Sequence, residues 1–340
     1  MLFRSEAVSR HFQILAEQSF NAVGEGYYSG DNHTHSVHSD GVHSIAENSA
    51  TMYEKRLHSW GYVTEHNTFS HQQDAQDVSQ SYDGHFYSLA GAEITTPLGH
   101  ALVYGIDQAP NFQVDGITRT WQDSIDEITS SGGLFYLAHP FEQTYAFQTP
   151  YEWRGFTGVE VWNGTWHALD GNVNEQAFRF WDEINIRGDN KYYGIANTDG
   201  HTKDKVGDTY SKGHLTELSE DNIVQLLGSG KFYGSNGPDI RFHVDGIEMG
   251  GTLQIHGARL AAFHIEAYDP NSNLTSVKLI KYPVTGDIAD YAQREVVFQA
   301  NELHTDTFIE TIMLPVEDGQ FYRLEVRSEK ASEGSSGIGP

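Results

Sequence analysis

Short apolar runs recur along the first two thirds of the chain, and nearly every one ends in a polar or ionisable residue. Runs of this length are typical of buried β-strands, and the polar or helical stretches between them are typical of βα units. In βα barrels the strand ends on one rim carry the chemistry. The pattern therefore predicts a barrel with its polar groups on that rim. The expected strands are 26–33, 58–66, 85–94, 100–106, 132–140, 156–163 and 191–197.

The pattern changes after residue 234. Short strands with alternating polar and apolar residues follow, such as 259–268, 276–282 and 321–328, which is an all-β pattern. We therefore expect an α/β fold with an N-terminal helical extension over 1–28, which includes an amphipathic helix from Val8 to Phe20. A barrel over 29–234 and a C-terminal β-sandwich-like domain over 235–340 would follow. The polar stretch from Asn67 to Asp83 is expected to be an exposed loop.

The charge of the chain restricts its partners. Lys and Arg total 21 against 47 Asp and Glu, so the formal net charge is -26. This excess of carboxylates does not suit long duplex nucleic acid, whereas a small anionic substrate is compatible with it where clustered cations reverse the local potential. No apolar run is long enough to span a bilayer, and the first residues lack a signal-peptide pattern. We expect a cytoplasmic protein that does not enter membranes, and the oligomeric state is left open.

The absence of cysteine excludes disulfides, thiolate metal sites and a Cys nucleophile. Any bound metal must therefore have nitrogen and oxygen ligands. His33 and His35 lie two residues apart at the end of the first run. Side chains at positions i and i+2 of a strand share a face, so both imidazoles can meet one cation. Asp40 and Gly41 then place a carboxylate at a tight turn.

The same ligand types recur where later runs end. His66, Glu93 and His139 each close an apolar run, and Asp199 and His201 follow the last one. One such residue is weak evidence, but their recurrence at strand ends is improbable by chance. Nitrogen and carboxylate ligands suit Zn, Mn and Fe about equally. The sequence predicts a site for two or three divalent cations (Zn, Mn or Fe).

These residues stand in a characteristic order of short motifs. The order is H-x-H-x(4)-D-G, T-E-H-N, G-x-E, A-H-P, E-x-x-N and D-x-H, and it extends from Gly30 to Gly207. In this order the chain resembles the PHP (polymerase and histidinol phosphatase) superfamily of metal-dependent hydrolases. The remainder, with G-K-F-Y-G-S-N-G-P at 230–238, resembles its carbaryl-hydrolase-type branch, in which a β-sandwich follows the barrel.

The resemblance implies a distorted (β/α)7 barrel whose ligands are shared among three cations. The first cation would be held by His33, His35, Glu93 and Asp199, the second by His139 and His100 with Glu93 as the bridge, and the third by Asp40, His66 and His201. Catalysis would use a metal-bridging hydroxide held by Glu93, together with Asp199 and His201. The chain departs from the family at Glu65, where Asp is usual, and at Thr198, where Ser is common. The first departure would change hydrogen bonding to His66.

Four residues are candidates for support of a ligand or contact with the substrate. Glu160 and Asn163 end a strand, where they would either support a ligand or brace the barrel mouth as a buried pair. Lys203 would either hold an anionic group or form a salt bridge to Asp204 or Asp208.

His38 would touch the substrate or be a solvated loop residue. His100 begins a strand, where a ligand and a structural histidine are both plausible. Tyr145, Trp162 and Trp166 would either form a wall of the substrate site or pack in the barrel.

Three functions fit this pattern. The first is a metal-dependent phosphoesterase that hydrolyses a small or terminal phosphate ester, such as a phosphomonoester, a nucleotide or a short oligonucleotide. The ligand set for three cations favours it, because charge spreads over several phosphoryl oxygens during the reaction. The second is a carbamate, ester or amide hydrolase with the same centre, and the third is an inactive binding protein. The complete ligand set argues against the third.

Overall fold

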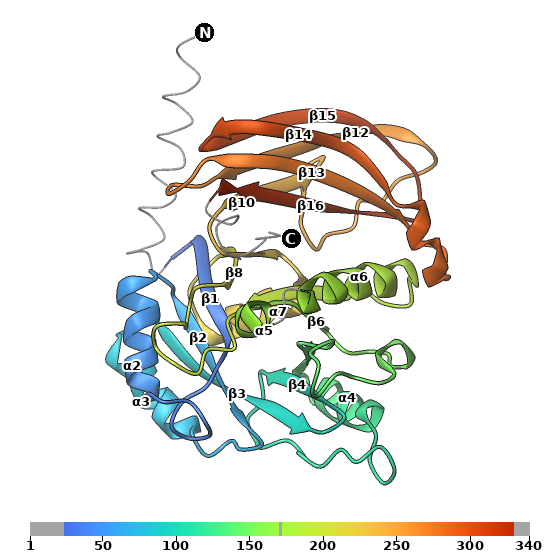
Figure 1. Ribbon diagram of the computed structural model, residues 1–340. Coiled ribbons are helices and arrows are strands. Elements are labelled where there is room, and N and C mark those ends of the chain that lie inside the picture. The colour runs from blue at the N-terminus through green and yellow to red at the C-terminus, as the bar shows by residue number, and fades with distance from the viewer. Residues whose placement is uncertain (1–23, 170–171, 330–340) are drawn as a thin grey trace.

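The structure is a computed structural model that describes residues 24–169 and 172–329. The helix expected from Val8 to Phe20 lies outside the described residues. The described chain forms one large, nearly closed sheet with helices around it, and two antiparallel sheets stacked against one side of it (Figure 1). No helix within the described ranges is long and apolar enough to cross a membrane.

The large sheet has nine strands, in the order β7-β6-β5-β4-β3-β2-β1-β8-β9. Its two ends approach each other, since β7 also contacts β8 and β9, so the sheet curls into a barrel. All the apolar runs expected from the sequence form strands of this sheet. The strands are β1 (Gly26–Thr34), β2 (Trp60–His66), β3 (Tyr87–Thr96), β4 (Gly99–Tyr104), β5 (Leu134–Ala138), β6 (Gly158–Asn163), β7 (Tyr193–Asn197), β8 (Tyr210–Leu215) and β9 (Phe232–Ser235).

Strand direction departs from a uniform βα barrel. β4 runs antiparallel to both β3 and β5, and β8 runs antiparallel to β1 and β9. The remaining neighbours pair in parallel. The barrel architecture is therefore present, but the (β/α)7 count expected from the resemblance is not confirmed.

Helices cover the outside of the barrel (Figure 1). They are α2 (Ile45–Ala50), the π-helix at Thr51–Lys55, α3 (Gln72–Ser81), α4 (Trp121–Ser130), α5 (Gly164–Leu169), α6 (Val173–Ile186) and α7 (Glu220–Ser229), with a 3-10 turn at Pro150–Glu152. The prediction of an exposed loop from Asn67 to Asp83 is wrong, because α3 occupies most of this segment. Ala75 and Val78 share one face of α3 and pack against Val63 and Ile45. These two apolar positions anchor a helix that is otherwise polar.

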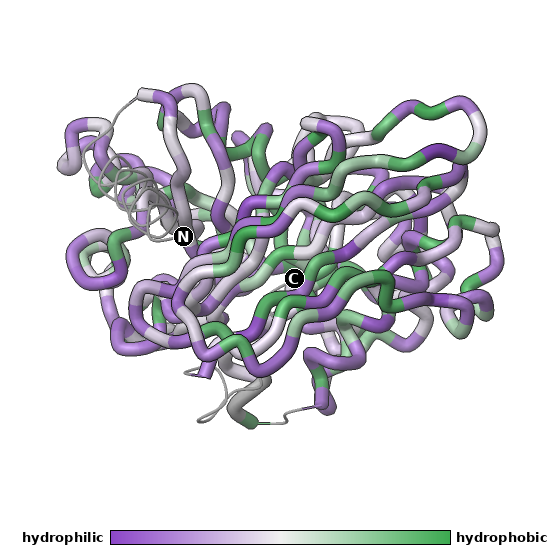
Figure 2. The backbone as a smooth tube through the Cα atoms, turned by 90° about the horizontal axis from the view of Figure 1, so that it is seen from above, coloured by the Kyte–Doolittle hydropathy of each residue, from purple (hydrophilic) through white to green (hydrophobic). Residues whose placement is uncertain are grey.

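The C-terminal part is a β-sandwich, as the alternating pattern predicted. One sheet has the order β11-β10-β12-β15 and the other β14-β13-β16, and all pairs are antiparallel. Apolar and polar residues alternate along these strands (Figure 2), and residues from both sheets form a common core. The strands are β10 (Asp239–Val244), β11 (Ile247–Glu248), β12 (Arg259–Tyr268), β13 (Leu274–Pro283), β14 (Glu295–Thr305), β15 (Thr307–Val316) and β16 (Gln320–Ser328), with a 3-10 helix at Ile288–Gln293.

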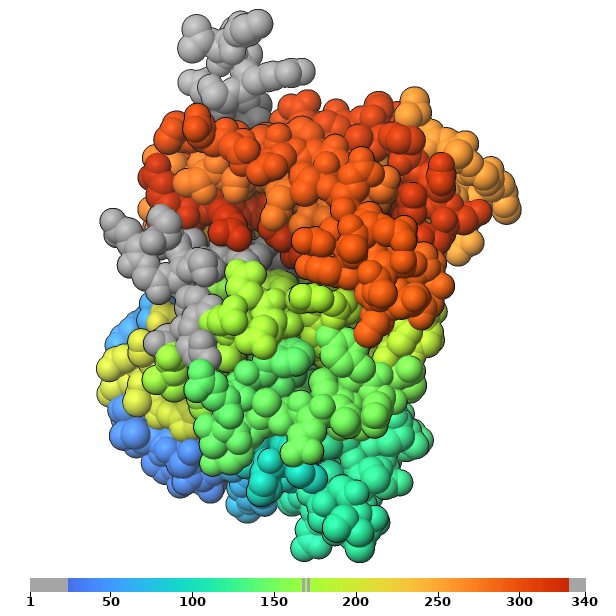
Figure 3. Space-filling view, turned by 45° about the vertical axis from the view of Figure 1, so that its right-hand side comes forward, coloured from blue at the N-terminus to red at the C-terminus, as the bar shows by residue number. Residues whose placement is uncertain are grey.

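The sandwich stacks on the barrel over α6 (Figures 1 and 3). Ile186 of α6 packs with Ile280 and Tyr282 of β13 in a small buried cluster. β9 ends at Ser235 and β10 begins at Asp239, so the strands of the two parts meet there. The exact domain limits stay a prediction.

His58, just before β2, makes the stability of the barrel depend on pH. Its Nε2 lies 2.8 Å from the carbonyl oxygen of Gly207, and its Nδ1 lies 2.8 Å from Ser29 Oγ, which suits a neutral ring. Burial lowers the pKa of His58 from 6.5 to about 4. Between these values the unfolded chain binds a proton that the folded chain does not. We therefore expect the free energy of unfolding to fall as pH drops from 6.5 to 4, with His58 contributing up to ~3 kcal/mol of the loss.

Urea unfolding of the wild type and His58→Gln across this pH range measures the effect. The variant is expected to lose less stability than the wild type on acidification. Parallel pH profiles for the two proteins would contradict this assignment.

Candidate metal centre

The predicted ligands meet on one rim of the barrel. β1, β2, β3 and β5 run in the same direction and bring His33, His66, Glu93 and His139 to their carboxyl ends. β4 runs the opposite way, so its first residues lie on the same rim. His100 consequently pairs in register with Thr95 on one side and with Ala138 on the other. The reversed strand explains how a residue at a strand start joins residues at strand ends.

Glu93 lies at the middle of this cluster and is fully buried. Its Oε1 is 2.9 Å from His100 Nδ1 and 3.1 Å from His139 Nε2. Its Oε2 is 2.9 Å from His66 Nδ1, 3.3 Å from His33 Nε2 and 3.4 Å from His35 Nε2. The two carboxylate oxygens thus face two different sets of histidines, which is the arrangement of a carboxylate that bridges two cations.

Asp199 closes the cluster from the end of β7. Its Oδ1 lies 3.1 Å from His35 Nε2 and 3.3 Å from His33 Nε2, and all three residues are buried. Two buried groupings have ligand atoms close enough to share a cation: His33, His35 and Asp199, and His33, Glu93 and His139. We call them the inner groups.

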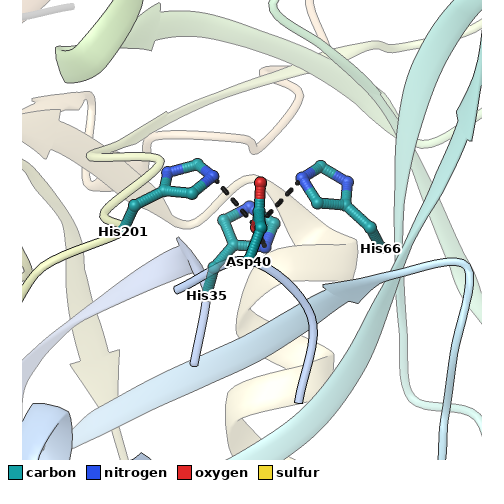
Figure 4. Close-up of side chains that lie close together, drawn as sticks. All are labelled: His35, Asp40, His66 and His201. Atoms are coloured by element: carbon teal, nitrogen blue, oxygen red, sulfur yellow. Dashed lines mark ion pairs between the residues drawn. The ribbon is translucent and has the colours of Figure 1, made fainter. Parts of the chain in front are cut away.

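A further group lies nearer the solvent, and we call it the outer group. It consists of His35, Asp40, His66 and His201, which point toward one another in Figure 4. Asp40 Oδ1 is 3.3 Å from His201 Nε2, 3.5 Å from His66 Nε2 and 3.9 Å from His35 Nδ1. A fourth grouping of His66, Glu93 and His100 connects the outer group to the inner groups. His35 therefore belongs to the outer group and to an inner group, and His66 belongs to the outer group and to the fourth grouping.

Hydrogen bonds determine which ring nitrogen of His33 and of His201 faces the cluster. His33 Nδ1 lies 2.9 Å from Glu160 Oε1, and His201 Nδ1 lies 2.9 Å from the carbonyl oxygen of Asp199. Each Nδ1 acts as the N–H donor, so Nε2 is the ring nitrogen that faces the cluster. This is the usual way in which proteins orient histidine ligands.

Two of the candidate ligands have strained backbones. His139 has φ 23° and Asp199 has φ 53°, both in the left-handed region that non-glycine residues seldom adopt. The amide of His139 donates to Glu160 Oε2 over 2.9 Å, which helps to hold that residue in place. Strain of this kind is kept where a side chain must point in one direction, and active sites are its usual location.

The electrostatics of the cluster demand positive charge. Burial would raise the pKa of Asp199, but His33 and His35 hold that pKa far below its usual value. For His66 the effects are reversed: burial would lower its pKa, but the carboxylates of Glu93, Asp40 and Asp199 raise that pKa to about 9. Carboxylates this deeply buried require a cationic partner, which is either a protonated histidine or a metal ion.

The donor set fits divalent metals. His35 Nδ1, His100 Nε2 and His139 Nδ1 are buried atoms that have no hydrogen-bond partner within residues 24–169 and 172–329, although buried polar atoms normally have one. Neutral imidazoles and carboxylates are ligands of Zn, Mn and Fe, and no sulfur ligand is present. The nine residues predicted as ligands from the sequence all lie in this cluster.

Glu160 and Asn163 form hydrogen bonds with several candidate ligands. Glu160 Oε1 accepts hydrogen bonds from His33 Nδ1 and Asn197 Nδ2. Glu160 Oε2 accepts hydrogen bonds from the His139 amide and Asn163 Nδ2. Asn163 Nδ2 also lies 3.2 Å from Asp199 Oδ2. The buried pair thus contacts three candidate ligands, His33, His139 and Asp199, and its role in supporting them stays a prediction.

We expect Glu160→Gln to weaken metal binding about 10- to 100-fold, because the amide holds His33 less firmly and makes its ring a poorer ligand. Equilibrium titration with Zn²⁺ measures this. Glu175→Gln, an exposed change on α6, is the matched control and should bind as the wild type does. Equal affinities for the wild type and Glu160→Gln would refute the supporting role.

The remaining candidates lie farther from the ligands. His38 pairs with Asp74 of α3 over 2.9 Å. Lys203 Nζ lies 3.9 Å from Glu47 Oε1, an ion-pair partner that the sequence did not indicate.

The three aromatic candidates differ in exposure. Trp162 is buried in the barrel core. Tyr145 is 40% exposed and stacks on His100 with ring centroids 4.9 Å apart, while the half-buried Trp166 lies 5.8 Å from the His139 ring. Of the three, only Tyr145 and Trp166 stand beside the ligands.

The sequence reasoning missed Asp31 as a structural residue. This buried carboxylate accepts hydrogen bonds from the amides of Thr198, Gly207 and His33. It therefore fastens the segment that carries Asp199 to β1. Its position two residues before His33, on the same strand face, was the available signal.

No family model and no curated protein matches the sequence. Among solved structures, the chain is similar to a two-domain protein from Bacteroides vulgatus that contains a predicted PHP-like metal-dependent phosphoesterase, with 15% identity and a TM-score of 0.50. The match covers 87% of this chain and 88% of that one. An amidohydrolase from Chromobacterium violaceum with bound sulfate and no metal matches 52% of this chain and 89% of its own, with 17% identity and a TM-score of 0.39.

The first similarity extends over both parts of the chain and supports the fold described above. At this identity it does not establish the activity, since one fold hosts many reactions. The second superposition is too loose to carry an argument.

Proposed function

We propose that this chain is a metal-dependent hydrolase of the PHP superfamily that cleaves small phosphate esters. The observation that carries the proposal is Glu93, whose two oxygens face different histidine sets within 3.4 Å. A bridging carboxylate among buried nitrogen ligands is the arrangement of a site with adjacent cations. Two inner cations and one outer cation, of Zn, Mn or Fe, suit the ligand groups.

The residues of the chain would divide the work. His33, His35 and Asp199 would hold one inner cation, and His139 and His100 would hold the other. One carboxylate oxygen of Glu93 would serve each of them. Cations bound there supply Lewis acidity and bring the pKa of a water nucleophile down to about 7. Glu160 and Asn163 keep the ligand geometry fixed, and the partly exposed outer group faces arriving substrate.

The phosphoester preference rests on the number of cation positions. Three cations, for which the four overlapping ligand groupings offer enough ligands, would match a group whose charge spreads over several oxygens. They would also attract an anion to a protein of net charge -26. Hydrolysis of a carbamate, ester or amide is the second candidate, and it follows from the resemblance to the carbaryl-hydrolase-type branch.

A substrate panel with the Mn²⁺- and Zn²⁺-loaded protein separates these functions. We expect turnover of phosphomonoesters or nucleotides at least about tenfold faster, in kcat/KM, than turnover of aryl carbamates and esters. Turnover of carbamates with inert phosphoesters would favour the second candidate. Full metal loading without turnover of either class would overturn both.

A further inference from the structure

The turn that carries Asp40 follows the end of β1 and has hydrogen bonds of its own. We call residues Ser36–Gly41 the Asp40 turn. It closes on itself through the carbonyl of Ser36, which accepts from the amides of Ser39 at 3.2 Å and Gly41 at 2.9 Å. Gly41 has no room for a side chain, because an added Cβ would collide with the carbonyl group of His35. The turn therefore sits tightly over the end of β1.

Glu65 of β2 holds this turn with both of its carboxylate oxygens. Its Oε1 accepts from the amide of Ser36 at 2.9 Å and from the hydroxyl of Ser36. Its Oε2 accepts from the hydroxyl of Ser39. The side chain is fully buried, and burial raises the pKa of its carboxyl group, although the hydrogen bonds from Ser36 and Ser39 oppose that rise. All the hydrogen bonds described for the Glu65 carboxylate go to the Asp40 turn.

Glu65 reaches the turn from the helix side of β2. Successive residues of a strand point to opposite faces, so Glu65 shares a face with Val63, which packs against Ile45 and Ala75 of the covering helices. His66 points instead to the rim and the candidate ligands. The bonding to His66 that we expected from this position is therefore replaced by bonding to the turn.

Asp40 depends on the turn for its position. Its side chain is 56% exposed, and it is the one carboxylate in the outer group, where the other three ligands are histidines. The outer group thus draws its negative charge from a residue whose place near His201 and His66 depends on the conformation of the turn. The inner groups consist of residues at strand ends and do not include the turn.

We propose that Glu65 is a positioning residue for the outer cation: it fixes the Asp40 turn and thereby sets the affinity of the outer position without affecting the inner ones. This inference rests on the proposed function, since it requires that the cluster binds cations. It implies two classes of cation in one site, an inner pair held by the barrel and an outer one held by a clamped turn.

Mn²⁺ titration of the metal-free full chain, with free Mn²⁺ followed by electron paramagnetic resonance, tests this. The proteins are the wild type, Glu65→Ala, Asp40→Asn and the double variant. We expect three bound Mn²⁺ in the wild type. Asp40→Asn removes the outer one, and Glu65→Ala weakens that one alone by about 10- to 100-fold. The double variant should bind as Asp40→Asn does, because both changes act on one position.

Two further variants provide a second test and a control. Ser39→Ala removes one hydrogen bond to Glu65 and should weaken the outer cation by a smaller factor, which keeps the test valid if Glu65→Ala does not fold. Glu54→Ala, an exposed change on the neighbouring π-helix, is the matched control and should bind three Mn²⁺ with wild-type affinity.

The possible failures are distinguishable. Wild-type affinities at all three positions in Glu65→Ala would overturn the inference alone, as would a loss of all three cations. A wild type that binds only two Mn²⁺ would also overturn it while leaving the hydrolase proposal standing, because the inner pair suffices for hydrolysis. A wild type that binds no Mn²⁺ or Zn²⁺ would contradict the proposed function itself.

Discussion

Replacing Glu93 with Gln is expected to remove more than one cation and to lower kcat/KM by at least about a thousandfold. The thousandfold loss corresponds to roughly 4 kcal/mol of transition-state stabilisation. The reason is that each oxygen of Glu93 faces its own histidine set, so one amide substitution removes a negative ligand from two positions at once. The amide nitrogen would also stand beside imidazoles that need an acceptor or a metal.

Metal analysis of the purified variant, together with its turnover of the best substrate from the panel, measures this effect. Glu310→Gln, an exposed change on β15, is the control and should retain full metal content and turnover. If Glu93→Gln kept both metal content and turnover, the bridging role of Glu93 would have to be abandoned.

Arg323→Met is expected to destabilise the folded chain by about 3–5 kcal/mol, the largest effect on stability that we anticipate. Arg323 of β16 makes two parallel hydrogen bonds of 2.9 Å to Asp182 of α6, and both side chains are buried. Tyr282 donates to the same carboxylate over 2.7 Å. Removing the guanidinium leaves the Asp182 charge buried between barrel and sandwich without its partner.

The double variant Asp182→Leu/Arg323→Met isolates the cause. It removes the Asp182 charge together with that of Arg323, and Glu325, the other carboxylate bound to Arg323, keeps its ion pair with Lys278. The double variant should therefore recover most of the stability lost by Arg323→Met. Urea unfolding measures the three proteins, and the Zn²⁺ content should stay at the wild-type level because these residues lie outside the ligand groups. A loss below about 1 kcal/mol for Arg323→Met would show that the pair does not stabilise the junction of the two parts.

The location of the candidate site could be predicted because strand pattern and ligand type point the same way. His66, Glu93 and His139 each follow a buried apolar run, and parallel strands bring their carboxyl ends to one rim. His100 was harder, since an apolar run carries no mark of its direction. The reversal of β4 became visible only in the pairing with β3 and β5.

Features that depend on distant partners could not be predicted. Glu65 holds Ser36 and Ser39 across 26 to 29 positions of sequence, and nothing local indicates that it would turn away from His66. α3 was missed because its segment is polar and only Ala75 and Val78 anchor it. In both cases tertiary contacts decide what local composition leaves open.

Anomalous diffraction from crystals grown with Zn²⁺ or Mn²⁺ tests the central claim most directly. The account predicts at least two strong peaks on the barrel rim, one near Oε1 and one near Oε2 of Glu93, with a third beside Asp40 when the outer position is filled. A crystal saturated with either metal that contains no peak within bonding distance of Glu93 would contradict it.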